Sequence, residues 1–194
     1  AFLSDNSGSA WGTCESEYGS MHVAEIGNLS SIIGAMNSDE GIVFTFGNTL
    51  ITTRLGKATR ILEALYDIND ISRRNCGFST ENGVWLFFDE AIHQKQHWDN
   101  IFIYSDMQAG HGGLYGYNSE DYRAMYRAMG FHIDEGYYPY IDVNKLVQIY
   151  RERVNPKVNV YCIETAGYTN VLAPEYGYRT AILYGWTGKE LIFA

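Results

Sequence analysis

The stretch AFLSDNSGSA, residues 1–10, decides how the rest of the chain is interpreted. It begins as a short apolar strand, ends that strand on Asp5 and continues into a turn that carries Ser7 and Ser9. Gly8 lets the backbone curl between the two serines because it has no Cβ. In the pattern Asp-x-Ser-x-Ser the carboxylate and the hydroxyls occupy alternate positions, so all three can point the same way. A hard divalent cation such as Mg²⁺ prefers oxygen ligands of this kind and typically keeps several waters.

The length and composition predict one globular domain over residues 1–194. A chain of 194 residues can bury a full hydrophobic core, and its 46% hydrophobic and 19% charged residues are ordinary for a soluble protein. No apolar run approaches the roughly 20 residues of a membrane span, and no signal peptide is visible. We therefore expect no contact with membranes. The chain opens on a strand without an initiator Met, so we expect it to be a piece of a longer protein.

The net charge limits the partners that this chain can bind, and the cysteine content indicates its cellular compartment. A formal net charge of −9 argues against nucleic-acid binding by this piece alone, because that binding depends on Lys and Arg neutralising phosphates. The three cysteines are odd in number and lack CxxC spacing. They predict a reducing, cytoplasmic location rather than a disulfide framework.

Apolar periodicity predicts an α/β fold of Rossmann-like type, with a mostly parallel sheet between helices. Residues 49–53 are expected to form one antiparallel edge strand, because a two-residue turn separates them from the preceding strand. Polar loops are predicted over 11–17 and 69–81, and a Tyr-rich insertion over 107–141 with a short helix at 119–129. The predicted helices are 18–36, 57–68, 81–95, 143–154 and 188–194, and the further strands are 41–46, 100–105, 157–163 and 179–184.

Oxygen-bearing side chains follow the ends of two predicted parallel strands. In open parallel sheets ligands bind at the carboxyl ends of the strands, where the strand order reverses. Asp5 ends the first strand, Asp106 ends a later one, and the loop 77–80 precedes a helix. These elements predict an octahedral site for Mg²⁺ or Mn²⁺, completed by water. Its predicted ligands are Asp5, Ser7, Ser9, Thr80 and Asp106.

This set resembles the metal-ion-dependent adhesion site (MIDAS) of von Willebrand factor A domains, and more specifically the version at the C-terminal end of TROVE proteins, the Ro ribonucleoprotein autoantigen family. The closer match rests on IVFTFGN (42–48), IFIYSD (101–106) and AILYGWTG (181–188). The resemblance covers the chain except for the insertion. It implies a non-catalytic domain whose metal takes an acidic group from a protein or a phosphate. It also implies a parent protein with an upstream ring of helical repeats that binds small noncoding and misfolded RNA.

Two features near the predicted site allow more than one interpretation. Phe78 interrupts what is usually a Gly-Gly pair, and the doublet of Ser79 and Thr80 leaves two candidate hydroxyls, of which we prefer Thr80. The insertion can form a surface that binds bases or proteins, or it can simply pack onto the domain. Further candidates for ligand contacts are Ser79, His111, Tyr115 and Tyr117.

Two other functions are compatible with the residues. One is a structural von Willebrand A scaffold whose metal site is vestigial. The other is a metal-assisted phosphoesterase, for which only Arg73 and Arg74 are available as phosphoryl clamps near the site loops. The chain contains no Gly-x-Ser-x-Gly elbow and no Walker A motif, so no catalytic residue is assigned.

Overall fold

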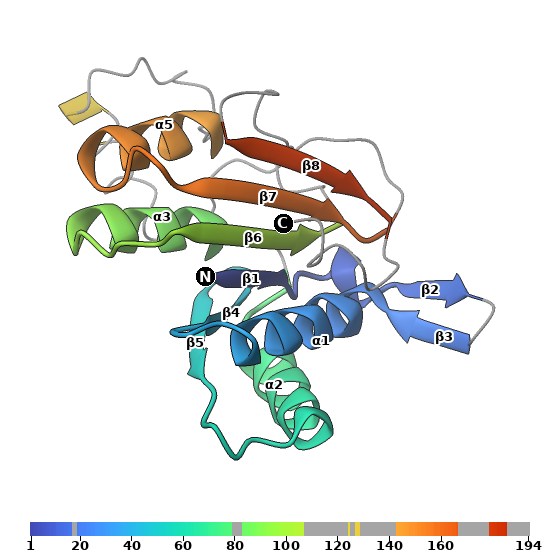
Figure 1. Ribbon diagram of the computed structural model, residues 1–194. Coiled ribbons are helices and arrows are strands. Elements are labelled where there is room, and N and C mark those ends of the chain that lie inside the picture. The colour runs from blue at the N-terminus through green and yellow to red at the C-terminus, as the bar shows by residue number, and fades with distance from the viewer. Residues whose placement is uncertain are drawn as a thin grey trace.

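A six-stranded sheet forms the centre of the molecule (Figure 1). The computed structural model describes residues 1–16, 19–78, 83–106, 124, 127–128, 143–166 and 179–185. The strand order is β5-β4-β1-β6-β7-β8, parallel throughout except for the antiparallel edge pair β4–β5. This confirms the predicted fold class and its single antiparallel edge strand. The strands are β1 (Phe2–Asp5), β4 (Ile42–Phe46), β5 (Leu50–Arg54), β6 (Asn100–Ser105), β7 (Asn159–Glu164) and β8 (Thr180–Tyr184).

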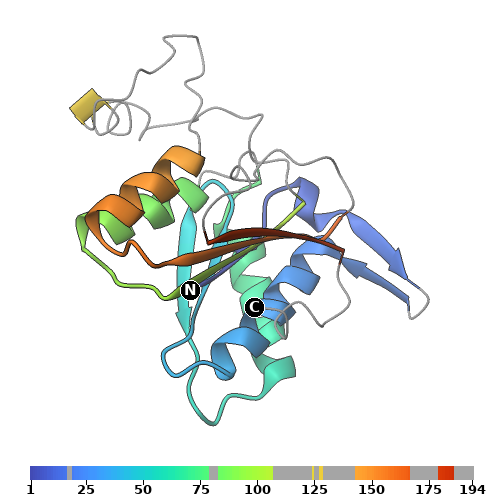
Figure 2. The ribbon, with the colours of Figure 1, turned by 45° about the horizontal axis from the view of Figure 1, so that its top comes forward.

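Helices cover both faces of this sheet (Figure 2). The pair α1 (Val23–Met36) and α2 (Ile61–Asn75) lies on one face, and the pair α3 (Gly83–His93) and α5 (Val143–Arg153) lies on the other. Each pair encloses its own core with the sheet. Strands β1 and β4 are buried at every position, as expected for parallel strands covered on both sides. Burial on both faces explains why these strands are continuous apolar runs in the sequence.

Gly27 allows α1 to lie directly on β1. A Cβ built on Gly27 would stand 2.5 Å from Ser4 Oγ, closer than any side chain tolerates. The helix can therefore approach the strand whose end carries Asp5.

The predicted helix 18–36 begins too early, and the predicted loop 11–17 is partly a strand. A 3-10 turn η1 (Ser9–Trp11) leads into a hairpin of β2 (Thr13–Ser16) and β3 (Gly19–His22). This hairpin projects from the side of the molecule where the parallel strands end (Figure 1). The apolar positions that suggested a helix all lie within α1, so the periodicity gave no support to the residues before it.

The predicted polar loop 69–81 is wrong over its first half, because α2 continues to Asn75. Its polar residues lie on the exposed face of the helix, where Arg74 and Asp70 form an ion pair of 2.7 Å. The chain leaves the helix at Gly77, which has a φ of +76°. Polarity alone therefore did not distinguish an exposed helical face from a loop.

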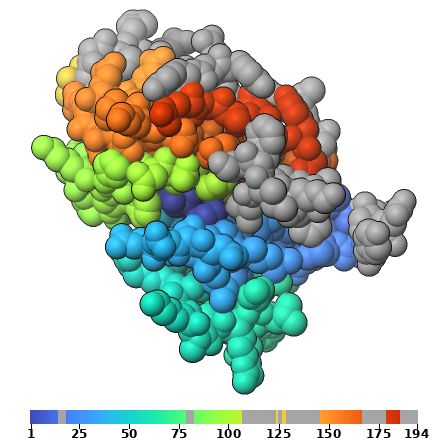
Figure 3. Space-filling view, in the orientation of Figure 1, coloured from blue at the N-terminus to red at the C-terminus, as the bar shows by residue number. Residues whose placement is uncertain are grey.

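The predicted helix 57–68 begins four residues too early, because α2 starts at Ile61. The remaining described elements agree with the sequence to within one or two residues. The insertion at 107–141, apart from residues 124, 127 and 128, and the helix at 188–194 lie outside the described residues. None of the described helices is long and apolar enough to cross a membrane. The outer face of α2, which forms the lower end of the molecule in Figure 3, exposes Leu62 and Tyr66.

Candidate metal site at the carboxyl edge of the sheet

The strand order reverses between β1 and β6. From β1 the chain adds β4 on one side, and it later adds β6 on the other side of β1. Asp5 ends β1 and Asp106 directly follows β6, so both carboxylates flank this switch point. Their exposed fractions are 2% and 0%. The structure thus places the two predicted acidic ligands at one edge, and their metal ligation stays a prediction.

Hydrogen bonds fix the Asp5 carboxylate from both sides. Asp5 Oδ1 accepts from the backbone N–H of Ser7 at 2.9 Å, and Oδ2 accepts from Ser105 Oγ at 2.6 Å. The Oγ atoms of Ser7 and Ser9 are 3.3 Å apart, with Ser7 buried and Ser9 exposed. The turn therefore brings the two serine hydroxyls together and ties the Asp5 carboxylate to the Ser7 backbone, and the shared metal ligation of the three side chains stays a prediction.

Buried amides hold the base of this turn. Asn6 and Asn28 exchange two side-chain hydrogen bonds of 2.9 and 3.1 Å, and Asn28 also donates to Asn69 Oδ1 at 2.8 Å. Trp11 Nε1 donates to the carbonyl of Asn6 at 3.2 Å. The guanidinium of Arg73 lies 4.0 Å from the centre of the Trp11 ring. The turn is thus tied to both α1 and α2.

A second loop contacts the same turn. Gly8 N donates to the carbonyl of Phe78 at 3.1 Å, and a Cβ on Gly8 would stand only 2.8 Å from that oxygen. Glycine is therefore needed here for close approach of the two backbones. Phe78 lies two residues before the predicted ligand Thr80. The predicted residues Ser79, Thr80, His111, Tyr115 and Tyr117 lie outside the described part of the chain.

Glu164, which the sequence analysis missed, adds a third carboxylate at this edge. It ends β7 and is 1% exposed, and among the described residues its Oε1 has no hydrogen-bond partner. Burial raises the pKa of Glu164, and the charge of Asp106 raises it further. A signal was present, because a third apolar strand ends on an acidic residue. The predicted strand stopped at residue 163, one position too early.

The donor set fits a hard, hydrated cation. Two buried carboxylates and serine hydroxyls are ligands that Mg²⁺ and Mn²⁺ accept, and Mg²⁺ retains water in the remaining positions. Across the described ranges no three His, Cys, Asp or Glu side chains are grouped so that they could bind one ion together. Any cation held there by the described residues would therefore also need hydroxyl or water ligands.

The thiol of Cys76 lies near this edge but is not activated. Cys76 is buried, and its Sγ lies 3.6 Å from Thr45 Oγ1. Burial raises the pKa of the thiol and the Asp5 charge raises it further, while hydrogen bonds with Thr45 and Ser72 lower it in part. A thiol with a raised pKa is a poor nucleophile at neutral pH.

Comparison with known proteins supports the fold but not a family assignment. No protein-family model and no curated protein sequence matches the chain. A crystal structure of the Ro (RSR) protein of Deinococcus radiodurans superposes with a TM-score of 0.61 over 98% of this chain, at 9% sequence identity. The chain spans 32% of the length of that protein. At this identity the likeness shows a shared fold.

Proposed function

We propose that this chain is a non-catalytic, metal-ion-dependent ligand-binding domain of von Willebrand A type. Asp5, Ser7, Ser9 and Asp106 would hold Mg²⁺ or Mn²⁺, together with Thr80 or its neighbour Ser79. The observation that carries the proposal is the burial of Asp5 and Asp106 on either side of the switch point. Buried carboxylates are costly unless a positive charge or hydrogen bonds compensate them, and a divalent cation supplies that charge.

The ligand in this proposal is an acidic group of a partner, either a protein carboxylate or a phosphate. The cation would keep at least one coordination position for it, because the described residues supply too few ligands to close the shell. We favour binding over a metal-assisted phosphoesterase because the two arginines near the site loops are engaged elsewhere, Arg73 over the Trp11 ring and Arg74 with Asp70.

We further propose that the domain belongs to a Ro-like protein of the cytoplasm, which binds noncoding or misfolded RNA through a region outside this chain. The fold shared with the D. radiodurans Ro protein supports this context. The net charge of −9 supports RNA binding elsewhere in the parent protein, since phosphates are repelled by an acidic surface. The three cysteines form no disulfide, which agrees with a reducing compartment.

Water-proton relaxation with Mn²⁺ tests this proposal. Binding of Mn²⁺ to the chain should enhance relaxation, and a short glutamate-rich peptide should then lower the enhancement by displacing metal-bound water. The matched glutamine-rich peptide should have no effect. No enhancement with wild type would refute the metal site, and an enhancement indifferent to the acidic peptide would refute the proposed ligand class.

A further inference from the structure

Glu164 lies in one row with Asp5 and Ser105 across three adjacent strands. The register of β6 and β7 pairs Ser105 with Glu164, and that of β1 and β6 pairs Ser4 with Tyr104, so Asp5 is the next neighbour of Ser105. Two positions earlier, Leu3, Ile103 and Cys162 all belong to the core beneath α3 and α5. Side chains alternate along a strand, so the row at the edge shares that face.

Ser105 joins two members of this row. Its hydroxyl donates to Asp5 Oδ2 at 2.6 Å, and Glu164 is its neighbour on the opposite strand. Asp106, the residue after Ser105, is near enough for its charge to act on the Glu164 carboxyl. Glu164 is therefore directed into the same edge as the two proposed acidic ligands.

One oxygen of the Glu164 carboxyl lacks a partner among the described residues. Glu164 is 1% exposed, and its Oε1 accepts no hydrogen bond within that part of the chain. Across the described ranges no Lys, Arg or His forms an ion pair with it. Buried polar atoms are nearly always hydrogen-bonded in native proteins, and an exception calls for an explanation such as an ion or a water.

We infer that Glu164 is a positioning residue of the proposed metal site, and that its Oε1 accepts a hydrogen bond from a water bound to the cation. This inference rests on the proposed function. A water-mediated role agrees with the described residues, in which no three acidic, His or Cys side chains are grouped closely enough to share one ion. It also agrees with the tendency of Mg²⁺ to keep several of its waters.

Such outer-shell partners set the affinity of a metal site. They orient the ligands and waters, and their loss typically weakens metal binding about 10–100-fold. Glu164 would thereby make the site hold its ion more firmly before any partner arrives. The same carboxylate would cost stability whenever the ion is absent, because it would then be buried beside Asp106 without a cation.

The test compares wild type with Glu164→Gln, which keeps the size of the side chain and removes its charge. Glu152→Gln is the matched control, since Glu152 is exposed on α5 and the change in net charge is the same. Mn²⁺ affinity is measured by calorimetry, thermal stability is measured in EDTA, and the number of Mn²⁺-bound waters is measured by relaxation. Glu164→Gln should bind Mn²⁺ about 10–100-fold more weakly, melt higher than wild type in EDTA and keep the number of bound waters.

The two proposals fail in different ways. If wild type and Glu152→Gln bind Mn²⁺ and Glu164→Gln binds it equally well, the inference is overturned while the proposed function stands. One additional bound water in Glu164→Gln would overturn the water-mediated role, because it would show a lost direct ligand. A lower melting temperature of Glu164→Gln in EDTA would point to a purely structural role. If wild type binds no Mn²⁺, the proposed function itself fails.

Glu164→Asp covers the case in which the Gln variant does not fold. It keeps the charge and shortens the side chain, so its Mn²⁺ affinity should lie between those of wild type and Glu164→Gln. An affinity equal to that of wild type would contradict a role that depends on the reach of Oε1.

Discussion

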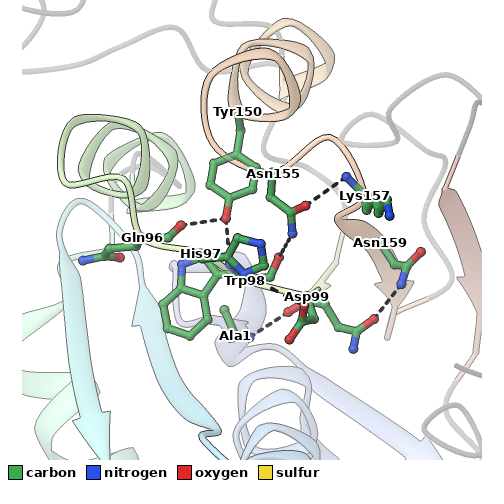
Figure 4. A network of polar contacts seen from close by, with 10 residues as sticks. Ala1, Gln96, His97, Trp98, Asp99, Tyr150, Asn155, Lys157 and Asn159 are labelled. Atoms are coloured by element: carbon green, nitrogen blue, oxygen red, sulfur yellow. Dashed lines mark hydrogen bonds and ion pairs between the residues drawn. The ribbon is translucent and has the colours of Figure 1, made fainter.

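The two ends of the central sheet handle buried polar groups in opposite ways. At the end where β6 and β7 begin, Tyr150 donates to the carbonyl of Gln96 at 2.7 Å and accepts from the N–H of Trp98 at 2.8 Å (Figure 4). Asn155 donates to the carbonyl of Trp98 at 2.7 Å and accepts from the N–H of Lys157 at 2.9 Å. Burial raises the pKa of Tyr150 to about 12, so the phenol stays neutral.

At the end where the same strands stop, three carboxylates are buried beside the hydrogen-bonded amides of Asn6 and Asn28. Asp5, Asp106 and Glu164 have at most 2% exposure, and within the described part of the chain Glu164 Oε1 accepts no hydrogen bond. The first end is built from neutral groups that satisfy one another, although the indole N–H of Trp98 is an exception. The second end gathers three carboxylates, and a cation bound there, as we propose, would balance their charge. The comparison thus contrasts a polar network that stabilises the fold with one that we propose binds a metal ion.

Neutralising Asp5 should have the largest effect on metal-dependent stability. With Mn²⁺ at 100 times its Kd, wild type should gain about 2.7 kcal/mol in free energy of unfolding. Asp5→Asn should lose that gain, because it removes a proposed ligand charge. Thermal unfolding with and without Mn²⁺ measures this difference. The control is Asp99→Asn at the other end of the sheet, where the side chain is 86% exposed. If Asp99→Asn also lost the stabilisation by Mn²⁺, the contrast between the two ends of the sheet would be wrong.

Removing the hydroxyl of Tyr150 should destabilise the end of the sheet where β6 and β7 begin and should leave the proposed metal site unchanged. Tyr150→Phe leaves the carbonyl of Gln96 and the N–H of Trp98 without their partner, which should cost about 1–3 kcal/mol in free energy of unfolding. Urea unfolding measures this loss, and Mn²⁺ affinity should be unchanged. The control is Tyr66→Phe, at an exposed side chain on α2, which should change the free energy of unfolding by less than about 0.5 kcal/mol. A weakened Mn²⁺ affinity in Tyr150→Phe would show that the two ends are coupled.

The pH dependence should distinguish the two ends in the absence of metal. Because the folded-state pKa of Glu164 is raised above its ordinary value of 4.5, its burial costs nothing below that value and costs most above the raised pKa. The stabilisation of Glu164→Gln over wild type in EDTA should therefore grow as the pH rises from below 4.5 to neutral. Parallel denaturation series at several pH values measure this difference, with Glu152→Gln, at an exposed position, as the charge-matched control. A difference that shrinks toward neutral pH would contradict the assigned burial cost.

The smallest effect is expected at the surface support of the metal-site turn. Arg73→Ala removes the cation–π contact with Trp11, which should cost about 0.5–1 kcal/mol at an exposed position. Arg74→Ala, whose ion pair with Asp70 is exposed, should cost still less. Urea unfolding of both variants measures the difference. Equal losses would mean that the Trp11 contact adds nothing to the turn.

Much of this fold is predictable because strands buried on both faces give continuous apolar runs. Residues 100–105 and 41–46 show this in the sequence, and they form β6 (Asn100–Ser105) and β4 (Ile42–Phe46). The hairpin before α1 was not predictable from periodicity, because its two short strands pair mainly with each other and lie outside the large core. The end of α2 was missed because its last turns expose polar side chains that are equally common in loops.

The candidate site, like the fold, contains some residues that the sequence predicts and others that it does not. Asp5 and Asp106 were predictable because each follows an apolar strand, and parallel strands bring their carboxyl ends to one edge. Glu164 gave the same signal, since it also ends an apolar strand, but its place in one row with Ser105 depends on the register between neighbouring strands, which one sequence does not specify. Glu164 in particular requires knowledge that β7 lies beside β6 and not beside β1.

The most direct test of the account is a calorimetric titration of wild type and Asp106→Asn with Mn²⁺, repeated with Mg²⁺. Wild type should bind one ion of either metal, and Asp106→Asn should bind at least about tenfold more weakly, since even outer-shell changes reach that size. Equal affinities in the two proteins, or no binding by wild type, would contradict a metal site at the carboxyl edge of the sheet.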